Sequence, residues 1–125
     1  MAPSGGRPQV EEIDSRGVAP VLIPDPGDGG AIDVSRSGFC DITTTGVDDT
    51  RTLGDPSFRG QEIMITFVSD GGNAVITAAS PVNQAGNTII TFSDIGESCV
   101  LRGHWNATDG WEWVAINLAN GEGYS

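Results

Sequence analysis

The sequence predicts an all-β fold: a small antiparallel β-sandwich or barrel preceded by an extended Pro/Gly-rich N-terminal arm. From Ala31 onward, short runs of high β propensity alternate with turn signals, and no segment shows a sustained helical period. Before that point, five of the seven prolines and six glycines fall within residues 1–30. Proline removes backbone donors that helices and central strands need. We therefore divide the chain into an arm, residues 1–30, and a β domain, residues 31–125.

The β domain contains seven candidate strands, each bounded by turn-forming residues. They span residues 31–35, 38–45, 61–69, 73–79, 87–93, 97–105 and 111–119. Short strands at this spacing are typical of a sandwich or a small barrel.

The arm ends in an apolar stretch, "VAPVLIP", at residues 18–24. A fully solvated tail has little reason to carry Val18, Val21, Leu22 and Ile23. We expect this segment to lie on a surface, either of its own domain or of a neighbouring subunit. The alternative is an unattached tail with an apolar patch that arose by chance.

The stretch "ITFVSDGGNAVIT", residues 65–77, places Gly71 and Gly72 between two apolar runs. A two-glycine turn with positive φ angles would join the runs into a hairpin. Asp70 would then be a turn residue facing Asn73, rather than a catalytic carboxylate. The same register pairs Val68 with Val75, Phe67 with Ile76 and Thr66 with Thr77, so that like residues face each other.

A second hairpin is expected around a loop at residues 93–98. Its strands would place Phe92 opposite Cys99 and Ile90 opposite Leu101, with all four side chains in the core. The chain has two cysteines, too few for a disulfide framework. We expect Cys40 and Cys99 to be thiols that act as small core residues.

The third hairpin has "NATDG", residues 106–110, as its loop. It pairs Trp105 with Trp111 and Gly103 with Trp113, and glycine leaves room for an indole ring. The opposite face carries a polar group that we interpret as a surface cluster: Arg102, His104 and Glu112. Further along, that face becomes apolar at Val114, Ile116 and Leu118. Either a β-bulge switches the sides of the strand, or both faces are covered by a partner.

The charge balance excludes several kinds of partner. Seventeen acidic residues face six basic ones, all arginine, for a net charge of −11. Binding of nucleic acid or of an anionic membrane needs a basic surface, so we expect neither partner. No apolar run approaches the ~20 residues of a membrane span, and the N-terminus lacks the pattern of a secretory signal. We expect folding in a cytosol.

No arrangement of residues supports catalysis or a cofactor. His104 is the only histidine, and no nucleophile-elbow motif accompanies it. Two separated cysteines and one histidine form no zinc motif. The acidic loops "PDPGDGG" and "GVDD" do not match the spacing of an EF-hand, and turn formation and solubility explain both. We therefore predict no enzymatic activity, no metal and no cofactor.

The three tryptophans, Trp105, Trp111 and Trp113, are the only feature that resembles a ligand site. Aromatic platforms of this kind bind carbohydrate in some β-sandwich modules. Indole rings are equally common in cores and subunit contacts. Both interpretations remain open at this point.

Residues 29–118 resemble small proteins encoded among the head genes of tailed bacteriophages. The similarity is carried by "TRTLGDPSFRGQ", by the "DGG" turn and by "VNQAGNTIITF"; none of these is a catalytic motif. The resemblance implies a capsid decoration (cement) protein, which binds the outside of a mature phage head and clamps neighbouring coat subunits. It also implies the major capsid protein as partner, a homotrimer, and a place on the outer capsid surface of the virion after assembly in the host cytoplasm.

The arm suits that role, because strand or arm addition between subunits uses backbone hydrogen bonds and a few apolar anchors. We take the partner-binding residues to be Val18, Val21, Leu22, Ile23, Trp105, Trp111 and Trp113. The alternative function is a glycan- or receptor-binding β domain of a tail fibre or spike, which would use the three tryptophans. A hydrolase would need paired carboxylates, and no such pair stands out.

Overall fold

The computed structural model describes residues 21–46, 48–69, 71–82, 87–119 and 123–124, and all regular structure in these ranges is β-strand. The strands are β1 (Val21–Leu22), β2 (Gly30–Ile32), β3 (Gly38–Thr43), β4 (Asp49–Leu53), β5 (Glu62–Ser69), β6 (Ala74–Val82), β7 (Asn87–Phe92), β8 (Ser98–Asn106), β9 (Gly110–Ala119) and β10 (Gly123–Tyr124). Each of the seven predicted segments overlaps one of them, and β1, β4 and β10 have no predicted counterpart. None of the described residues forms a helix that could cross a membrane.

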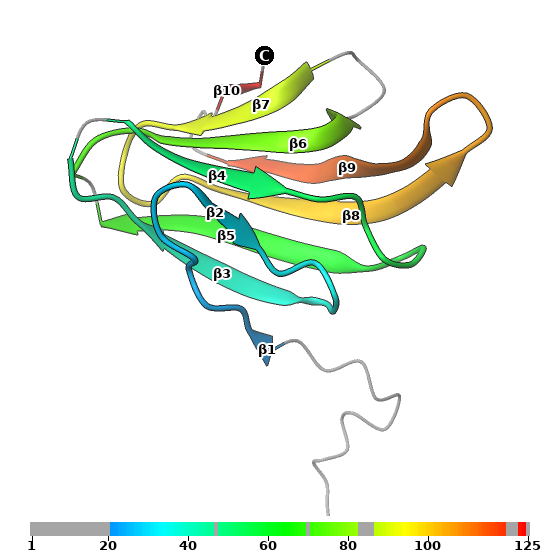
Figure 1. The fold of residues 1–125 in the computed structure, drawn as a ribbon, viewed down its shortest axis with the longest axis horizontal. Helices are drawn as coiled ribbons and strands as arrows, with labels where there is room; N and C mark the ends of the chain where they lie inside the picture. The colour runs from blue at the N-terminus through cyan, green and yellow to red at the C-terminus, as the bar shows by residue number, and fades with distance from the viewer. Residues whose placement is uncertain (1–20, 47, 70, 83–86, 120–122, 125) are drawn as a thin grey trace, which may run out of the picture.

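The strands form two five-stranded sheets that lie one above the other (Figure 1). Sheet I has the order β1-β3-β5-β8-β9, and sheet II has the order β10-β7-β6-β4-β2. The all-β prediction is therefore confirmed. Neither sheet closes into a barrel in the described ranges.

The prediction of antiparallel sheets is wrong, because both sheets are mixed. β3 pairs in parallel with β1 and β5, and β4 pairs in parallel with β2 and β6. From β1 to β6 the chain alternates between the two sheets, so strands two apart in sequence become neighbours and run in the same direction.

One hydrophobic core fills the space between the sheets. Its residues come from both of them: Ile23, Ile32, Cys40, Ile42, Leu53, Ile63, Ile65, Phe67, Ala74, Ile76, Ala78, Val82, Ile90, Phe92, Cys99, Leu101 and Trp113. Cys40 and Cys99 are fully buried and form no disulfide, as expected.

Two predicted hairpins are wrong. β5 lies in sheet I and β6 in sheet II, so Phe67 and Ile76 belong to opposite layers of the core. The glycines carry the chain across between sheets: the Thr44 hydroxyl accepts hydrogen bonds from the amides of Gly71 and Gly72, at 2.9 and 3.1 Å. A side chain at Gly71 would meet the Thr44 carbonyl. Asp70 lies outside the described residues.

The segment after Phe92 also crosses between sheets, since β7 belongs to sheet II and β8 to sheet I. Phe92 is therefore not opposite Cys99 in a ladder. All four residues of that prediction are nevertheless fully buried core residues, as expected: Ile90, Phe92, Cys99 and Leu101.

The third hairpin is confirmed in its register. β8 and β9 pair Trp105 with Trp111, Gly103 with Trp113 and His104 with Glu112. The register shifts between Val100 and Leu101, where Val100 faces Asn117 and Leu101 faces Ala115. A β-bulge was one of the two explanations for apolar positions on both faces. It brings Leu118 opposite Cys99, but Val114 stays opposite Arg102 and Ile116 is exposed, so it does not account for them.

Strand β4 was not predicted, because its inward positions include two charged residues. Asp49, Arg51 and Leu53 are buried while the residues between them are exposed. Arg51 is neutralised by Asp25, with Nε and Oδ1 2.7 Å apart. The segment from Val21 to Gly30 is thus attached to the β domain, through the β1 pairing, the buried Ile23 and this ion pair.

Candidate functional site

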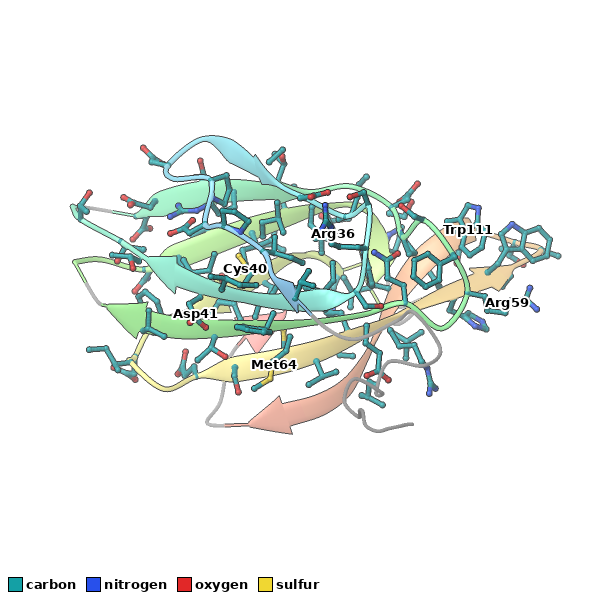
Figure 2. The ribbon with its side chains drawn as sticks, turned by 90° about the horizontal axis from the view of Figure 1, so that it is seen from below. Arg36, Cys40, Asp41, Arg59, Met64 and Trp111 are labelled. Carbon is teal, nitrogen blue, oxygen red and sulfur yellow. The ribbon has the colours of Figure 1, made fainter. Side chains whose placement is uncertain are left out.

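The outer face of sheet I, directed away from the core, carries a row of apolar side chains in register. Leu22 pairs with Phe39, Phe39 with Met64, and Met64 with Val100. Leu22 is 59%, Phe39 40% and Met64 43% exposed. Figure 2 is viewed from the side of this sheet and shows Met64 on β5. Four neighbouring strands thus contribute one apolar row that no described segment covers.

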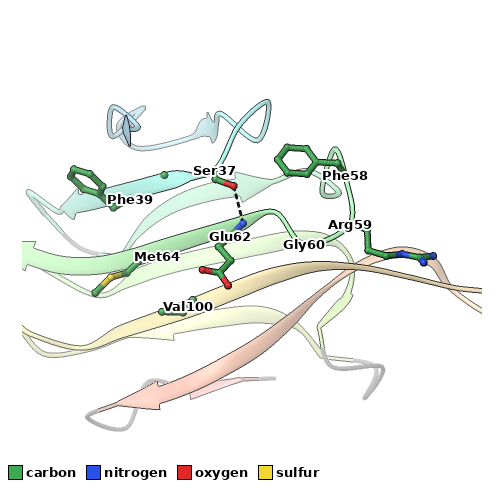
Figure 3. A pocket seen from close by; sticks show the side chains of 9 residues that line it. Ser37, Phe39, Phe58, Arg59, Gly60, Glu62, Met64 and Val100 are labelled. Atoms are coloured by element: carbon green, nitrogen blue, oxygen red, sulfur yellow. Dashed lines mark hydrogen bonds between the residues drawn. The ribbon is translucent and has the colours of Figure 1, made fainter. Parts of the chain in front are cut away.

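A hollow of about 740 Å³ lies over this row. Its lining is mostly apolar, with one carboxylate and one guanidinium: Ser37, Gly38, Phe39, Phe58, Arg59, Gly60, Glu62, Met64 and Val100. Figure 3 shows the rings of Phe39 and Phe58 at opposite ends of the hollow, with Met64 on β5 and Val100 on β8 below them. Such a hollow accepts apolar groups beside one acidic and one basic side chain.

The loop that carries Phe58 is held firmly in place. Gln61 is fully buried, and its Nε2 donates to the carbonyls of Val34 and Arg36 at 2.8 and 3.0 Å. Its Oε1 accepts from the Ser57 amide at 2.6 Å. The amide of Gly60 donates to the Gly103 carbonyl at 2.9 Å. The wall of the hollow is therefore preformed by hydrogen bonds.

Glu112 lies on the same outer face, opposite His104. We expected it to belong to an exposed polar cluster, and that expectation is wrong. Its side chain is fully buried, and neither carboxylate oxygen has a hydrogen-bond partner among the described residues. The Nδ2 of Asn106 is likewise buried without a partner. A buried carboxylate with no counter-charge is strongly unfavourable, so this position calls for a cationic or hydrogen-bonding partner.

The three tryptophans do not form one platform. Trp113 is a core residue, 1% exposed, and its Nε1 donates to the Gly54 carbonyl at 2.8 Å. Trp105 is 43% exposed and Trp111 is half-buried. Those two face each other near the tip of the β8–β9 hairpin, which projects beyond the neighbouring strands (Figure 1).

The predicted arm residues take different positions. Leu22 is exposed at the edge of sheet I, Val21 is half-buried, and Ile23 is a core residue of its own domain. Val18 lies outside the described residues. Of these positions, Leu22 is the one that continues the exposed row on the outer face.

The perturbed titratable groups do not form a reactive centre. Burial raises the pKa of Cys40 to about 11, with a smaller contribution from the Asp25 charge. Burial also tends to raise the pKa of Asp25, but hydrogen bonds from Arg51, Thr43 and Gly27 together hold it below the ordinary value. No group of three or more His, Cys, Asp or Glu side chains in the described ranges could hold a metal ion.

Comparison with known proteins gives no relative from which to assign a function: the sequence matches no family model and no curated protein.

Sequence analysis did not identify the hollow, although its residues alternate regularly with buried neighbours. Phe39 lies between Gly38 and Cys40, and Met64 lies between Ile63 and Ile65. Apolar residues on both faces of β3 and β5 were the available signal. It could not be used without knowing that β3, β5 and β8 are adjacent, because only their pairing turns scattered residues into a patch.

Proposed function

We propose that this protein is a capsid decoration protein that binds the outer surface of a phage head and stabilises contacts between coat subunits. In this proposal it is a β-sandwich with an N-terminal arm, forms a homotrimer, has no enzymatic activity, and has the major capsid protein as its partner on the virion. The sequence resemblance of residues 29–118 suggests the role. The observation that carries it is the apolar row on sheet I.

An exposed apolar row in a chain with a net charge of −11 is typical of a surface kept for a protein partner. The hollow beside Phe39 and Met64 would accept apolar side chains of the coat, while the net charge of −11 keeps free copies apart. Each contact can be weak, since many copies on a lattice and several contacts per copy multiply the effect. Leu22 and the arm preceding it extend the same contact, with the coat or with a sister copy.

The test is co-sedimentation with mature, undecorated heads of the phage that encodes the protein. We expect saturation at a fixed number of copies per head, matching one class of lattice positions. Phe39→Ser should weaken attachment at least tenfold. Ile95→Ser is the matched control, because Ile95 is an exposed apolar residue in the loop between β7 and β8, away from the row.

If the folded protein does not co-sediment, or if the two variants bind equally well, the proposed surface is wrong. Cooperative thermal unfolding of each variant establishes that it is folded.

The second candidate is a glycan- or receptor-binding domain that uses the β8–β9 tip. It is supported by the exposed indole of Trp105 beside Trp111, since paired indoles stack on sugar rings. Titration with host surface glycans should then shift the tryptophan emission, and Trp105→Ala should abolish the shift. An emission spectrum that no glycan changes argues against this function.

A further inference from the structure

The hollow on sheet I runs along the strands, with Phe39 at one end and Phe58 at the other (Figure 3). Its floor is three strands wide, because Phe39, Met64 and Val100 are neighbours on β3, β5 and β8. Two strand spacings are about 10 Å, whereas a helix with its side chains is about 10–12 Å across. A floor of this width between aromatic rings suits a single extended chain better than a helix.

One charged side chain is directed into the hollow and the other away from it. Figure 3 shows the Glu62 carboxylate beside Val100, over the strands, whereas the Arg59 side chain extends away from the hollow. The backbone of Glu62 is held in place, since its amide donates to the Ser37 hydroxyl at 3.1 Å. The hollow therefore presents a carboxylate, and not a guanidinium, to an occupant.

The Glu62 carboxylate is exposed and is not engaged in an ion pair. Arg102 lies opposite Glu62 in the β5–β8 ladder, but it is itself exposed and does not line the hollow. Among the described residues, the ion pair is the one between Arg51 and Asp25. The carboxylate is thus available to a cation that comes with the occupant, and the net charge of −11 attracts such a cation.

The spacing between the apolar floor and the carboxylate defines the pattern of the occupant. Glu62 and Met64 are two residues apart on β5, and both are exposed while Ile63 between them is buried. Side chains two residues apart in an extended strand lie about 7 Å from each other on the same side. An extended segment that runs along β5 with an apolar residue over Met64 therefore brings a residue two positions away level with Glu62.

We propose that the hollow binds an extended segment of the major capsid protein in which an apolar residue and an arginine or lysine are two positions apart. The apolar side chain lies over Met64, between the rings of Phe39 and Phe58. The cation pairs with the Glu62 carboxylate. The source of the segment rests on the proposed function, whereas its chemistry does not, so the two are tested separately.

The chemistry is tested with two blocked peptides of identical composition and charge. The first is Gly-Arg-Ser-Phe-Ser-Arg-Gly, in which each arginine is two positions from phenylalanine, and the second is Gly-Ser-Arg-Phe-Arg-Ser-Gly, in which each is adjacent to it. The chain has two methionines, Met1 and Met64. Labelling of the methionine methyl groups with ¹³C therefore gives an NMR signal from the floor of the hollow, which Met64→Leu assigns.

For the wild type, we expect the first peptide to bind about threefold tighter than the second, as is usual for one exposed ion pair. Glu62→Gln should abolish this preference. Asp41→Asn is the matched control and should keep it, because Asp41 is an exposed carboxylate on the same face outside the lining of the hollow. Phe39→Ser should weaken both peptides about fivefold or more, since it removes apolar contact area.

Three results would overturn the recognition pattern: equal affinity of the two peptides for the wild type, a preference that persists in Glu62→Gln, or no shift of the Met64 signal with either peptide at millimolar concentration. A Met64 signal that shifts with protein concentration in the absence of peptide would also overturn it. That result would identify a second copy of the chain as the occupant.

Co-sedimentation with undecorated heads tests the source of the segment. Glu62→Gln should weaken attachment several-fold and reduce its dependence on salt, whereas Asp41→Asn should change attachment by less than about twofold. If the wild type does not co-sediment, the proposed function is wrong and the coat is not the source, while the peptides still decide the chemistry. If the wild type co-sediments and the two carboxylate variants attach equally well, the proposed function stands and the pairing of the coat with Glu62 is overturned.

Discussion

The guanidinium of Arg51 holds the carboxylate of Asp25 with two hydrogen bonds, from Nε to Oδ1 at 2.7 Å and from Nη2 to Oδ2 at 3.1 Å. Nη2 also donates to the Thr43 carbonyl at 2.9 Å, and the Thr43 amide donates to Asp25 Oδ2 at 2.9 Å. Since Arg51 belongs to sheet II and Thr43 to sheet I, this group of side chains connects the two sheets to the entering chain.

Asp25→Asn should destabilise the domain by about 3 kcal/mol, because it leaves a fully buried guanidinium without its counter-charge. Arg51→Met should cost less, about 1–2 kcal/mol, because the Asp25 side chain is partly exposed and can be hydrated. Urea denaturation of both variants measures the two changes in the free energy of unfolding. A larger loss for Arg51→Met would show that packing of the long side chain, rather than its charge, dominates.

The Asp25–Arg51 pair also predicts how the stability of the protein changes at low pH. The pKa of Asp25 is lower in the folded protein than the ordinary value of 3.8. Its stabilising contribution is therefore complete above pH 3.8 and is lost as the pH falls towards the lower folded-state value. Between pH 5 and pH 2, wild type should lose stability faster than Asp25→Asn. The measurement is the melting temperature of both proteins at each pH. An equal fall in melting temperature for wild type and Asp25→Asn would contradict this contribution.

Gly103→Ala should destabilise the domain by about 1–3 kcal/mol. A Cβ at this position would lie 2.6 Å from the Phe58 carbonyl oxygen and 2.8 Å from Pro56 Cβ, so the loop that walls the hollow must move. Gly46→Ala is the control, because nothing lies within 4 Å of a Cβ there. Gly103→Ala should have a lower melting temperature than Gly46→Ala. Similar melting temperatures would mean that the loop carrying Phe58 can move at little energetic cost.

Trp113→Phe should cost about 2 kcal/mol, since it removes the hydrogen bond to the Gly54 carbonyl and part of the core volume. Trp105→Phe should change stability by less than about 0.5 kcal/mol, because that side chain is 43% exposed. Emission spectra provide a second measurement. Loss of Trp113 should remove the blue-shifted component, and a red shift on loss of Trp105 would contradict the assignment.

Cys40 should resist alkylation in the folded protein at pH 8. Its thiol is fully buried and its pKa is raised to about 11, so little thiolate forms and none is accessible. The labelling rate should follow the unfolded fraction as urea is added. Rapid labelling without denaturant would indicate local opening of β3.

Most strands were predictable from alternation and turn residues, with β1, β4 and β10 as the exceptions. The β8–β9 hairpin was predictable in its register. In that hairpin, the pairing of Gly103 with Trp113 and of Trp105 with Trp111 is constrained from within the segment itself. The connections at Gly71–Gly72 and after Phe92 carry equally strong turn signals. Nothing local specifies whether the next strand returns to the same sheet, and the decisive contact at Gly71 comes from Thr44, far away in sequence.

The candidate site was predictable only in part. Leu22 and Trp105 are exposed, but Ile23 and Trp113 could not be recognised as core residues without the layer that covers them. Glu112 illustrates the opposite problem. Its expected neighbours across the hairpin, Arg102 and His104, suggest a solvated carboxylate, but the side chain is fully buried.

The alternation of β1 to β6 between the two sheets has a consequence for how the chain folds. β3 meets β5 and β4 meets β6 only after an intervening strand has been placed in the opposite layer. Among the described strands, β6–β7 and β8–β9 are the pairs formed by consecutive segments. Loop-closure entropy must be overcome before the distant parallel pairs gain any contact energy, which slows folding. We therefore expect the C-terminal hairpins to supply the early contacts and the N-terminal half, which carries Leu22 and Phe39 of the apolar row, to be completed last.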